Sequence, residues 1–243
     1  MDSYLTKELT DSKSNGYLHY HAPRYQRLLE LLHRHHKPEA TLLDIGRTRF
    51  TTIASRSLST CIDNLGFEPD GKTSTGFNYQ FDLNDAADES GWRRDLPQYD
   101  IVLFCEVIEH LYTSPSQVLR FIRTLLKPGG IMILQTPNAV VLHKRIVMLL
   151  GRNPYALISE NTRNPAHFRE YTRNELREYF RITGFDVLEQ SAEAYFDYRY
   201  TDHARGSSRP HRALALLNWF YRITPASLRP GMCFVLQRPA TTD

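Results

Sequence analysis

Four short apolar runs that each end in or near an acidic residue constrain the fold of this chain most strongly. "TLLDIG" carries Asp44, "LSTCIDNLGFEPD" ends near Glu68, "FNYQFDLND" ends near Asp82, and "YDIVLFCEVIEHL" continues into Glu106. Short apolar runs without strict alternation are typical of strands in a parallel sheet covered on both faces. Because a ligand crevice lies outside the carboxyl ends of such strands, we expect the four acids to surround one site.

Helices and further strands are predicted around these runs. "APRYQRLLELLHRHH" and "SPSQVLRFIRTLLKPGG" repeat their apolar residues at helical spacing. "TRNELREYFRITGF" is also predicted to be helical and begins with a capping box of Thr172 and Glu175. "IMILQTPN", "FDVLEQSAEAYF" and "GMCFVLQRP" are predicted as strands. This alternation predicts a doubly wound α/β fold with a mostly parallel sheet.

The domain organisation predicted from the sequence has two parts. Residues 1–20 are polar and show no clear period, which predicts an N-terminal arm or lid. Residues 21–243 then form one large domain, a size that ordinary domains reach. Within it, residues 139–166 are predicted to be an insertion with one helix, because this basic and partly apolar segment is broken by Gly151 and Pro154.

The composition argues against several classes of protein. A net charge of +3 is too small to indicate nucleic-acid binding. No apolar run approaches the ~20 residues that span a bilayer, and the first residues lack the apolar core of a signal peptide. Cys61, Cys105 and Cys233 show no metal-binding spacing and lie in apolar runs, so we expect buried thiols and a cytoplasmic location.

The acids at the strand ends suit the nucleoside part of a cofactor. Glu68 ends the strand after Gly46, where an acid accepts hydrogen bonds from both hydroxyls of a ribose. Asp82 is placed to accept a hydrogen bond from an adenine amino group, and Leu83 to pack against the ring. The backbone of "CEVIEHL" is expected to flank the same ring.

The ordered set "LLDIG", "GFEPD", "FDLND", "YDIVLFCEVIEHL", "LLKPGGIMILQTPN" and "HFREYT" resembles class I S-adenosylmethionine-dependent methyltransferases over residues 41–187. The resemblance implies S-adenosyl-L-methionine as cofactor and a seven-stranded Rossmann-like sheet, parallel except for a reversed final strand, with a helical lid. Its similarity to ubiquinone-pathway and glycan enzymes implies O-methylation of a small molecule or saccharide. The implied cofactor-binding residues are Asp44, Gly46, Arg47, Glu68, Asp82, Leu83, Cys105 and Glu106.

The first loop departs from the Gly-x-Gly-x-Gly pattern of that family. Only Gly46 matches, and Arg47, Thr48, Arg49 and Phe50 replace the rest. One interpretation is that the loop still binds the cofactor, with Arg47 or Arg49 holding its carboxylate. The alternative is a non-catalytic relative with a decayed site. We favour binding, because the downstream positions are intact.

His110 and His167 are the predicted catalytic bases, with Glu109 beside His110, because histidine accepts protons near neutral pH. Structural roles remain the alternatives: a capping or buried His110 and a surface His167. "EVIEHL" followed by a later histidine also resembles small-RNA 2′-O-methyltransferases that use a divalent metal. Glu106, Glu109, His110 and His167 would then be ligands. Our prediction assigns no metal.

Two segments bear on the acceptor and on partners. "VVLHKRIVMLLGRNPY" places basic residues such as Arg145 and Arg152 beside an apolar face, which suits an anionic or lipid-linked acceptor or a peripheral membrane contact. An amphipathic lid packed on the core is the interpretation we favour. We likewise expect "ALALLNWFYRIT" to be a core helix rather than a membrane-docking one.

Overall fold

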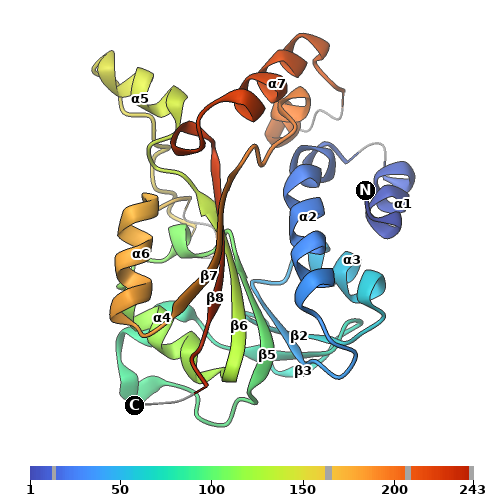
Figure 1. The fold of residues 1–243 in the computed structure, drawn as a ribbon, viewed down its shortest axis with the longest axis vertical. Coiled ribbons are helices and arrows are strands. Elements are labelled where there is room, and N and C mark those ends of the chain that lie inside the picture. The colour runs from blue at the N-terminus through green and yellow to red at the C-terminus, as the bar shows by residue number, and fades with distance from the viewer. Residues whose placement is uncertain (13–14, 162–165, 206–208, 241–243) are drawn as a thin grey trace.

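A mixed sheet runs through the middle of the molecule with helices on both of its faces (Figure 1). The computed structural model describes residues 1–12, 15–161, 166–205 and 209–240. The strands are β1 (Leu42–Ile45), β2 (Ile62–Gly66), β3 (Gly71–Lys72), β4 (Phe77–Gln80), β5 (Tyr99–Cys105), β6 (Leu126–Pro137), β7 (Asp186–Glu193) and β8 (Gly231–Gln237).

The strand order is β3-β4-β2-β1-β5-β6-β8-β7. Strands β4, β2, β1, β5 and β6 pair in parallel, and β8 is antiparallel to both of its neighbours, which confirms the predicted reversed final strand. The sheet has eight strands where seven were predicted. The extra strand, β3, pairs only Gly71 and Lys72 with β4, and two residues carry no readable period.

The described helices are α1 (Ser3–Asp11), α2 (Gly16–His35), α3 (Arg49–Leu58), α4 (Pro115–Thr124), α5 (Leu142–Leu149), α6 (Arg173–Ile182) and α7 (Ala215–Ile223). Short 3-10 turns are η1 (Leu83–Ala87), η2 (Glu89–Gly91), η3 (Ile108–His110), η4 (Tyr198–Arg205), η5 (Arg212–Leu214) and η6 (Ala226–Leu228). The capping box of Thr172 and Glu175 is present at the start of α6.

Two helical segments were not predicted from the sequence. Residues 1–20, predicted as an aperiodic arm or lid, contain α1 and the first turn of α2. Residues 49–58 form α3, which buries Phe50 and Ile53 and begins with a capping box of Thr48 and Thr51. Because α3 begins at Arg49, the altered first loop contains little more than Arg47 and Thr48.

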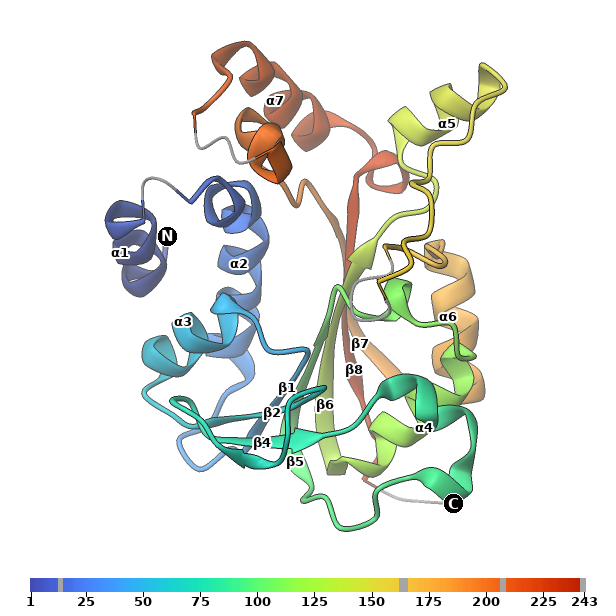
Figure 2. The ribbon, with the colours of Figure 1, turned by 180° about the vertical axis from the view of Figure 1, so that it is seen from behind.

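The apolar core has two parts, one on each face of the sheet. Successive strand residues point to opposite faces, so Leu42 joins the cluster beneath α2 and α3, while Leu43 joins the cluster beneath α4 and α6. Figure 2 shows the same layers from behind. The predicted sheet covered on both faces is therefore confirmed.

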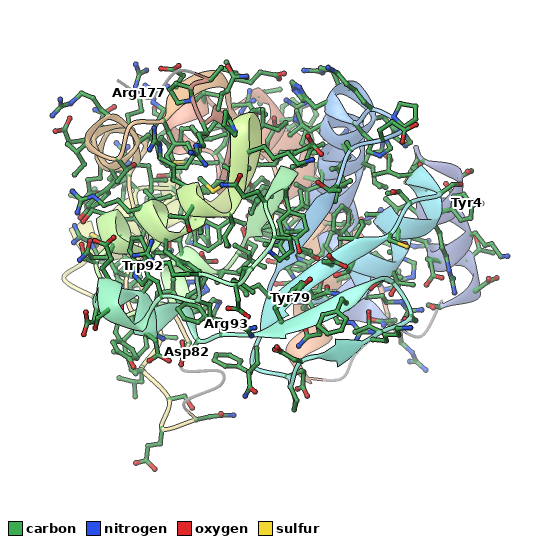
Figure 3. All side chains as sticks on the ribbon, turned by 90° about the horizontal axis from the view of Figure 1, so that it is seen from below. Tyr4, Tyr79, Asp82, Trp92, Arg93 and Arg177 are labelled. Atoms are coloured by element: carbon green, nitrogen blue, oxygen red, sulfur yellow. The ribbon has the colours of Figure 1, made fainter. Side chains whose placement is uncertain are left out.

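Polar pairs lie at the edge of the sheet formed by the short β3 and the end of β4. Arg93 pairs with Asp70 at 2.8 Å and with Asp95 at 2.5 Å, and its guanidinium lies 6.0 Å from the Tyr79 ring centre (Figure 3). A charged side chain at an open edge opposes pairing with another strand.

Cys61 is exposed, so the expectation that its thiol is buried is wrong. Its position just before β2, rather than within it, leaves it in solvent.

Helices α5 and α7 extend beyond the sheet at one end of the molecule (Figures 1 and 2). The prediction that α7 is a core helix is wrong, since Tyr221 is its one buried residue. Helix α5 buries only Lys144. Its apolar side therefore does not pack on the core, contrary to the favoured interpretation. Among the described residues, no helix combines the length and apolar character needed to cross a membrane.

Candidate active site

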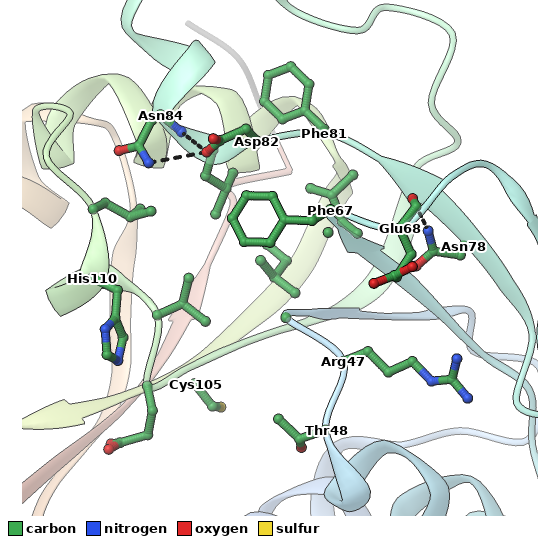
Figure 4. A pocket seen from close by; sticks show the side chains of 18 of the residues that line it. Arg47, Thr48, Phe67, Glu68, Asn78, Phe81, Asp82, Asn84, Cys105 and His110 are labelled. Carbon is green, nitrogen blue, oxygen red and sulfur yellow. Dashed lines mark hydrogen bonds between the residues drawn. The ribbon is translucent and has the colours of Figure 1, made fainter. Parts of the chain in front are cut away.

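A cavity of about 510 Å³ opens at the carboxyl edge of the parallel strands (Figure 4). It lies where β1 neighbours both β2 and β5, which is the point where the strand order reverses. Its volume is within the range of small-molecule sites. The predicted residues that line it are Gly46, Arg47, Glu68, Asp82, Leu83, Cys105, Glu106, His110 and His167. Asp44 and Glu109 do not line it.

Gly46 makes the sharp turn from β1 toward α3. Its φ of +80° lies in the left-handed region that favours glycine, and its amide donates to the Leu65 carbonyl oxygen at 2.9 Å. An added Cβ would lie 3.2 Å from Val107 Cγ2. The one glycine kept from the family pattern therefore stands where the backbone requires it.

Asp44 stabilises the turn at Gly46. It is buried and accepts a hydrogen bond from Thr51 Oγ1 at 2.5 Å, while Thr51 Oγ1 accepts from the Thr48 amide at 3.1 Å. Burial raises the pKa of Asp44 to about 7, with the Thr51 hydrogen bond opposing the shift. Asp44 thus ties β1 to α3, and the capping box organises a loop that lacks further glycines.

The two arginines of the altered loop have different positions. Arg49 donates to Glu8 of α1 at 2.8 Å and to Ser12 at 2.5 Å, so the prediction that it holds a cofactor carboxylate is wrong. It points away because it belongs to the first turn of α3. Arg47 lies at the rim of the cavity, 3.5 Å from Ser74 Oγ. Phe50 is buried, with its ring 5.1 Å from that of Tyr25, and does not line the cavity.

Asp82 and Leu83 line one wall of the cavity. Asp82 caps η1 by accepting from the Asn84 amide at 2.9 Å and from Asn84 Nδ2 at 3.1 Å (Figure 4). Leu83 is buried and supplies an apolar surface beside it. These contacts fix the Asp82 carboxylate without using all of its acceptor positions.

Glu68 and Phe67 form the neighbouring wall just after β2. The Glu68 side chain is exposed at the rim, while its carbonyl oxygen accepts from Asn78 Nδ2 at 2.6 Å. Phe67 is 41 % exposed although it is large and apolar, and its ring lines the cavity (Figure 4). Sequence reasoning missed Phe67. Its place directly before Glu68 was the available signal.

Glu106 has a strained backbone. It follows β5 with a φ of +57°, which costs a residue other than glycine about 1–2 kcal/mol. Its amide donates to the Gln135 carbonyl oxygen at 2.8 Å, which holds the turn in place. Backbone strain of this kind clusters at functional sites, so the turn after β5 is a candidate on geometry as well as on sequence.

Helix α2 supplies Tyr17, His21 and Arg24 to the cavity, and sequence reasoning missed all three. Arg24 is only 4 % exposed, and its guanidinium lies 3.7 Å from Glu106 Oε1. Its Nε atom has no hydrogen-bond partner among the described residues. Burial raises the pKa of Glu106, and the nearby Arg24 charge opposes that shift. Arg24 is thus a buried cation with an unused donor at the cavity wall.

Two histidines come together at the other end of the cavity. The rings of His110 and His167 lie 4.8 Å apart, centre to centre. His110 Nδ1 is 2.8 Å from the Ala166 carbonyl oxygen, and His167 Nδ1 is 2.9 Å from Glu170 Oε1. A carbonyl and a carboxylate only accept, so both Nδ1 atoms donate and each Nε2 is left as the acceptor of a neutral ring. Burial lowers the pKa of His110, which favours its neutral form.

Glu109 lies behind these rings. It is fully buried, its Oε2 accepts from Thr136 Oγ1 at 3.0 Å, and its Oε1 has no hydrogen-bond partner among the described residues. One ligand atom each of Glu109, His110 and His167 lies within 4.8 Å of the others. Glu106 is not in this group, because the turn after β5 is the short η3 rather than an α-helix.

Glu170 connects the histidine pair to α5. It is buried and accepts from His167 on one oxygen and from Lys144 Nζ on the other. These two partners hold the pKa of Glu170 below its usual value, although burial opposes the shift. The orientation of His167 therefore depends on a buried ion pair that the sequence did not reveal.

Comparisons with known proteins bear on the family and the fold of this chain. A family model described as a methyltransferase domain matches residues 17–190. A probable S-adenosylmethionine-dependent methyltransferase of Mycolicibacterium smegmatis is 35 % identical over 88 residues, which cover 36 % of this chain and 29 % of that protein. The chain therefore spans less than a third of the curated relative it matches.

Solved structures share the fold at low sequence identity. A chain from the complex between the Haloferax volcanii Trm112 methyltransferase activator and the putative methyltransferase is 15 % identical, with a TM-score of 0.59, over 98 % of this chain and 99 % of that one. A putative sarcosine dimethylglycine methyltransferase from Galdieria sulphuraria is 15 % identical, with a TM-score of 0.57, over 91 % and 88 %.

Proposed function

Because this chain belongs to the methyltransferase-domain family and carries an S-adenosylmethionine-dependent methyltransferase domain, we propose that it methylates a hydroxyl oxygen of a small molecule or saccharide. The observation that carries the proposal is the histidine pair, in which both Nδ1 atoms are already bonded and both Nε2 atoms remain as acceptors. A hydroxyl acceptor needs a base of this kind, whereas an amine with a free lone pair does not.

The cavity has groups that complement each part of S-adenosylmethionine. We assign the ribose hydroxyls to Glu68, the adenine amino group to Asp82, and the adenine ring to the apolar surface of Leu83 and Phe67. The pair of Arg24 and Glu106 then faces the amino-acid end, where a buried cation and a carboxylate complement the carboxylate and ammonium of a zwitterion.

In the proposed reaction, the acceptor oxygen attacks the methyl carbon in line with the sulfonium leaving group. The C–S bond breaks as the C–O bond forms, and S-adenosylhomocysteine leaves. The hydroxyl proton passes to Nε2 of His110 or His167. Glu170 then stabilises the positive charge if His167 accepts it, because its carboxylate is bonded to Nδ1 of that ring.

Calorimetric titration with S-adenosylmethionine tests cofactor binding, and transfer of labelled methyl tests the reaction. We expect label in a base-stable methyl ether, with small-molecule, saccharide and RNA fractions offered separately. His110→Gln and His167→Gln should each lower turnover about 10²–10⁴-fold with little change in cofactor Kd. His36→Gln, which lies outside the cavity, is the matched control. A base-labile ester product, or full turnover in both variants, would contradict the proposal.

A metal-assisted reaction, as in the RNA 2′-O-methyltransferase alternative, is the second candidate. The residues present fit a divalent ion: Glu109 Oε1 is buried without a hydrogen bond, and each histidine donates its other nitrogen to an oxygen, as metal-binding histidines do. Glu109, His110 and His167 would hold the ion. An ion there would act as a Lewis acid on the acceptor oxygen.

Cobalt and manganese titrations test the metal candidate without any acceptor. A visible Co²⁺ spectrum that His167→Gln abolishes and His36→Gln leaves intact would support a metal centre. Absence of a spectrum, with turnover unchanged by a chelator, would leave the histidines as bases alone.

A further inference from the structure

Helices α5 and α7 both project past the same end of the sheet (Figures 1 and 2). Each helix, and the segment that follows α5, carries large apolar side chains that are exposed to solvent. Leu149 is 86 % exposed, Leu157 is 93 % exposed and Leu216 is 72 % exposed. Leu150, Trp219 and Ile223 are also exposed. We call these six residues the projecting surface. Single exposed apolar residues are ordinary, but a cluster at one end of a molecule marks a contact with a partner.

The two helices are joined at their bases. His143 of α5 bonds through Nδ1 to the Tyr221 hydroxyl of α7 at 3.0 Å, and Tyr221 stacks on Tyr198 with ring centres 5.2 Å apart. Lys144, on the neighbouring position of α5, is tied to the buried Glu170. Helix α5 is therefore bonded to Glu170, which also bonds to His167 in the active site.

The charge around the projecting surface is mainly positive, although Glu160 and Asp202 flank it and Asp202 pairs with His211 at 2.8 Å. Residues 139–159 and 203–242 contain no aspartate or glutamate. Among the described residues of these two segments, the exposed arginines are Arg145, Arg152, Arg209, Arg212 and Arg222. Apolar side chains bordered by arginines, with no acidic residue in either segment, match the two layers of an anionic lipid surface: the acyl boundary and the negative headgroups.

Self-association fits this surface poorly. A two-fold interface between copies brings the same patch face to face, so the arginines of both copies would gather in one interface. Like charges opposed across an interface cost several kcal/mol. The charge pattern therefore favours a negatively charged occupant over a second copy of this chain.

We propose that the projecting surface docks the protein peripherally on an anionic phospholipid bilayer. The leucines and Trp219 enter the headgroup region, and the arginines contact the lipid phosphates. This inference goes beyond the proposed methyl transfer and does not depend on it.

Trp219 provides the readout, because the chain has two tryptophans and they differ in environment. Trp219 is 60 % exposed, whereas Trp92, labelled in Figure 3, is 8 % exposed and packs on Phe121. Phosphatidylcholine vesicles containing phosphatidylglycerol should carry the protein upward in a density gradient and shift its emission to the blue. Trp219→Phe should abolish the shift but retain flotation.

Charge and apolar variants separate the two contributions to docking. Arg152→Gln with Arg222→Gln should weaken partitioning about 25-fold, since each arginine near an anionic surface contributes about fivefold. Leu149→Glu with Leu216→Glu should abolish flotation. Leu188→Glu is the control, because Leu188 is 47 % exposed on β7, outside the projecting surface.

Several outcomes would overturn the proposal. These are no flotation by the unmodified protein, equal binding to phosphatidylcholine alone, or a dimer in solution that Leu149→Glu dissociates. Calorimetry with S-adenosylmethionine on the same variants keeps this test apart from the proposed function. Unchanged cofactor affinity in a variant that no longer floats would support docking as a separate property.

Discussion

Replacing Arg24 with methionine should weaken binding of S-adenosylmethionine by removing the partner of its carboxylate. Arg24 is buried, lines the cavity and has a donor without a partner among the described residues. A hydrogen bond between charged groups contributes about 1.5–3 kcal/mol, so Kd should rise about 10- to 150-fold. Methionine keeps much of the apolar stem, which limits the loss of packing against α2's neighbours.

A decarboxylated analogue of S-adenosylmethionine makes this prediction specific. The unmodified protein should bind the analogue about as weakly as Arg24→Met binds the intact cofactor. Arg24→Met should bind both ligands with similar affinity, because the group that distinguishes them is gone. Isothermal titration calorimetry on the four combinations of protein and ligand forms a thermodynamic cycle. Its coupling energy is the free energy of interaction between the Arg24 guanidinium and the cofactor carboxylate.

Two controls protect the interpretation. Arg27→Met removes an arginine from the same helix, but Arg27 contacts Glu193 at 3.4 Å and does not line the cavity, so cofactor Kd should not change. Losing Arg24 would also leave Glu106 buried without its cation, which Arg24→Met with Glu106→Gln avoids. Equal weakening of both ligands by Arg24→Met would refute the reasoning and show that the guanidinium only supports the cavity wall.

Three further predictions follow from single contacts. Glu68→Ala should raise cofactor Kd about tenfold or more in calorimetry, and unchanged affinity would show that the ribose assignment is wrong. Glu170→Ala should lower the free energy of unfolding in urea by about 3–5 kcal/mol, because Lys144 is left buried and unpaired. Lys144→Met in the same chain should restore part of that loss. Equal stability of Glu170→Ala and the unmodified protein would contradict this prediction. Burial raises the pKa of Asp44 from 3.8 to about 7, so between these pH values the folded state keeps a proton that the unfolded state releases. The free energy of unfolding should therefore fall as the pH rises from about 4 to about 7. Asp44→Asn should remove this fall, as measured by urea midpoints. Equal pH dependence in both proteins would refute the burial of a protonated Asp44.

Local sequence patterns were enough for most of the sheet and for five of the described helices, α2, α4, α5, α6 and α7. Strands β1 and β5 are mostly apolar, and α6 begins with the predicted capping box of Thr172 and Glu175. Helix α3 was missed because Arg49 and Phe50 were assigned to a loop expected to be rich in glycine. The capping box of Thr48 and Thr51 was present in the sequence, but the expected loop obscured it.

Most of the predicted cavity residues follow strands, whereas Phe67 after β2 and the residues on α2 were missed. Glu68, Asp82 and Glu106 come directly after strands, and parallel strands bring such positions to one edge. Arg24 lies on helix α2, whose periodicity identifies the apolar face of the helix. The periodicity does not indicate which segments cover the polar residues of that helix. The cation for the cofactor carboxylate was therefore sought in Arg47 or Arg49, near Gly46 in the sequence. Arg47 lies at the cavity rim, whereas Arg49 binds Glu8.

The sequence by itself determined the alternation of elements, the edge where the site lies and the family to which the chain is similar, because these depend on periodicity and on residues close together in the chain. Only the tertiary structure decided that α2 brings Arg24 against Glu106, that Glu170 connects Lys144 of α5 with His167, and that α5 and α7 expose their apolar sides together. The physical reason is that burial and pairing depend on contacts between segments that are distant in the chain. In addition, the same amphipathic pattern occurs in a helix that packs on the core and in a helix whose apolar side faces outward.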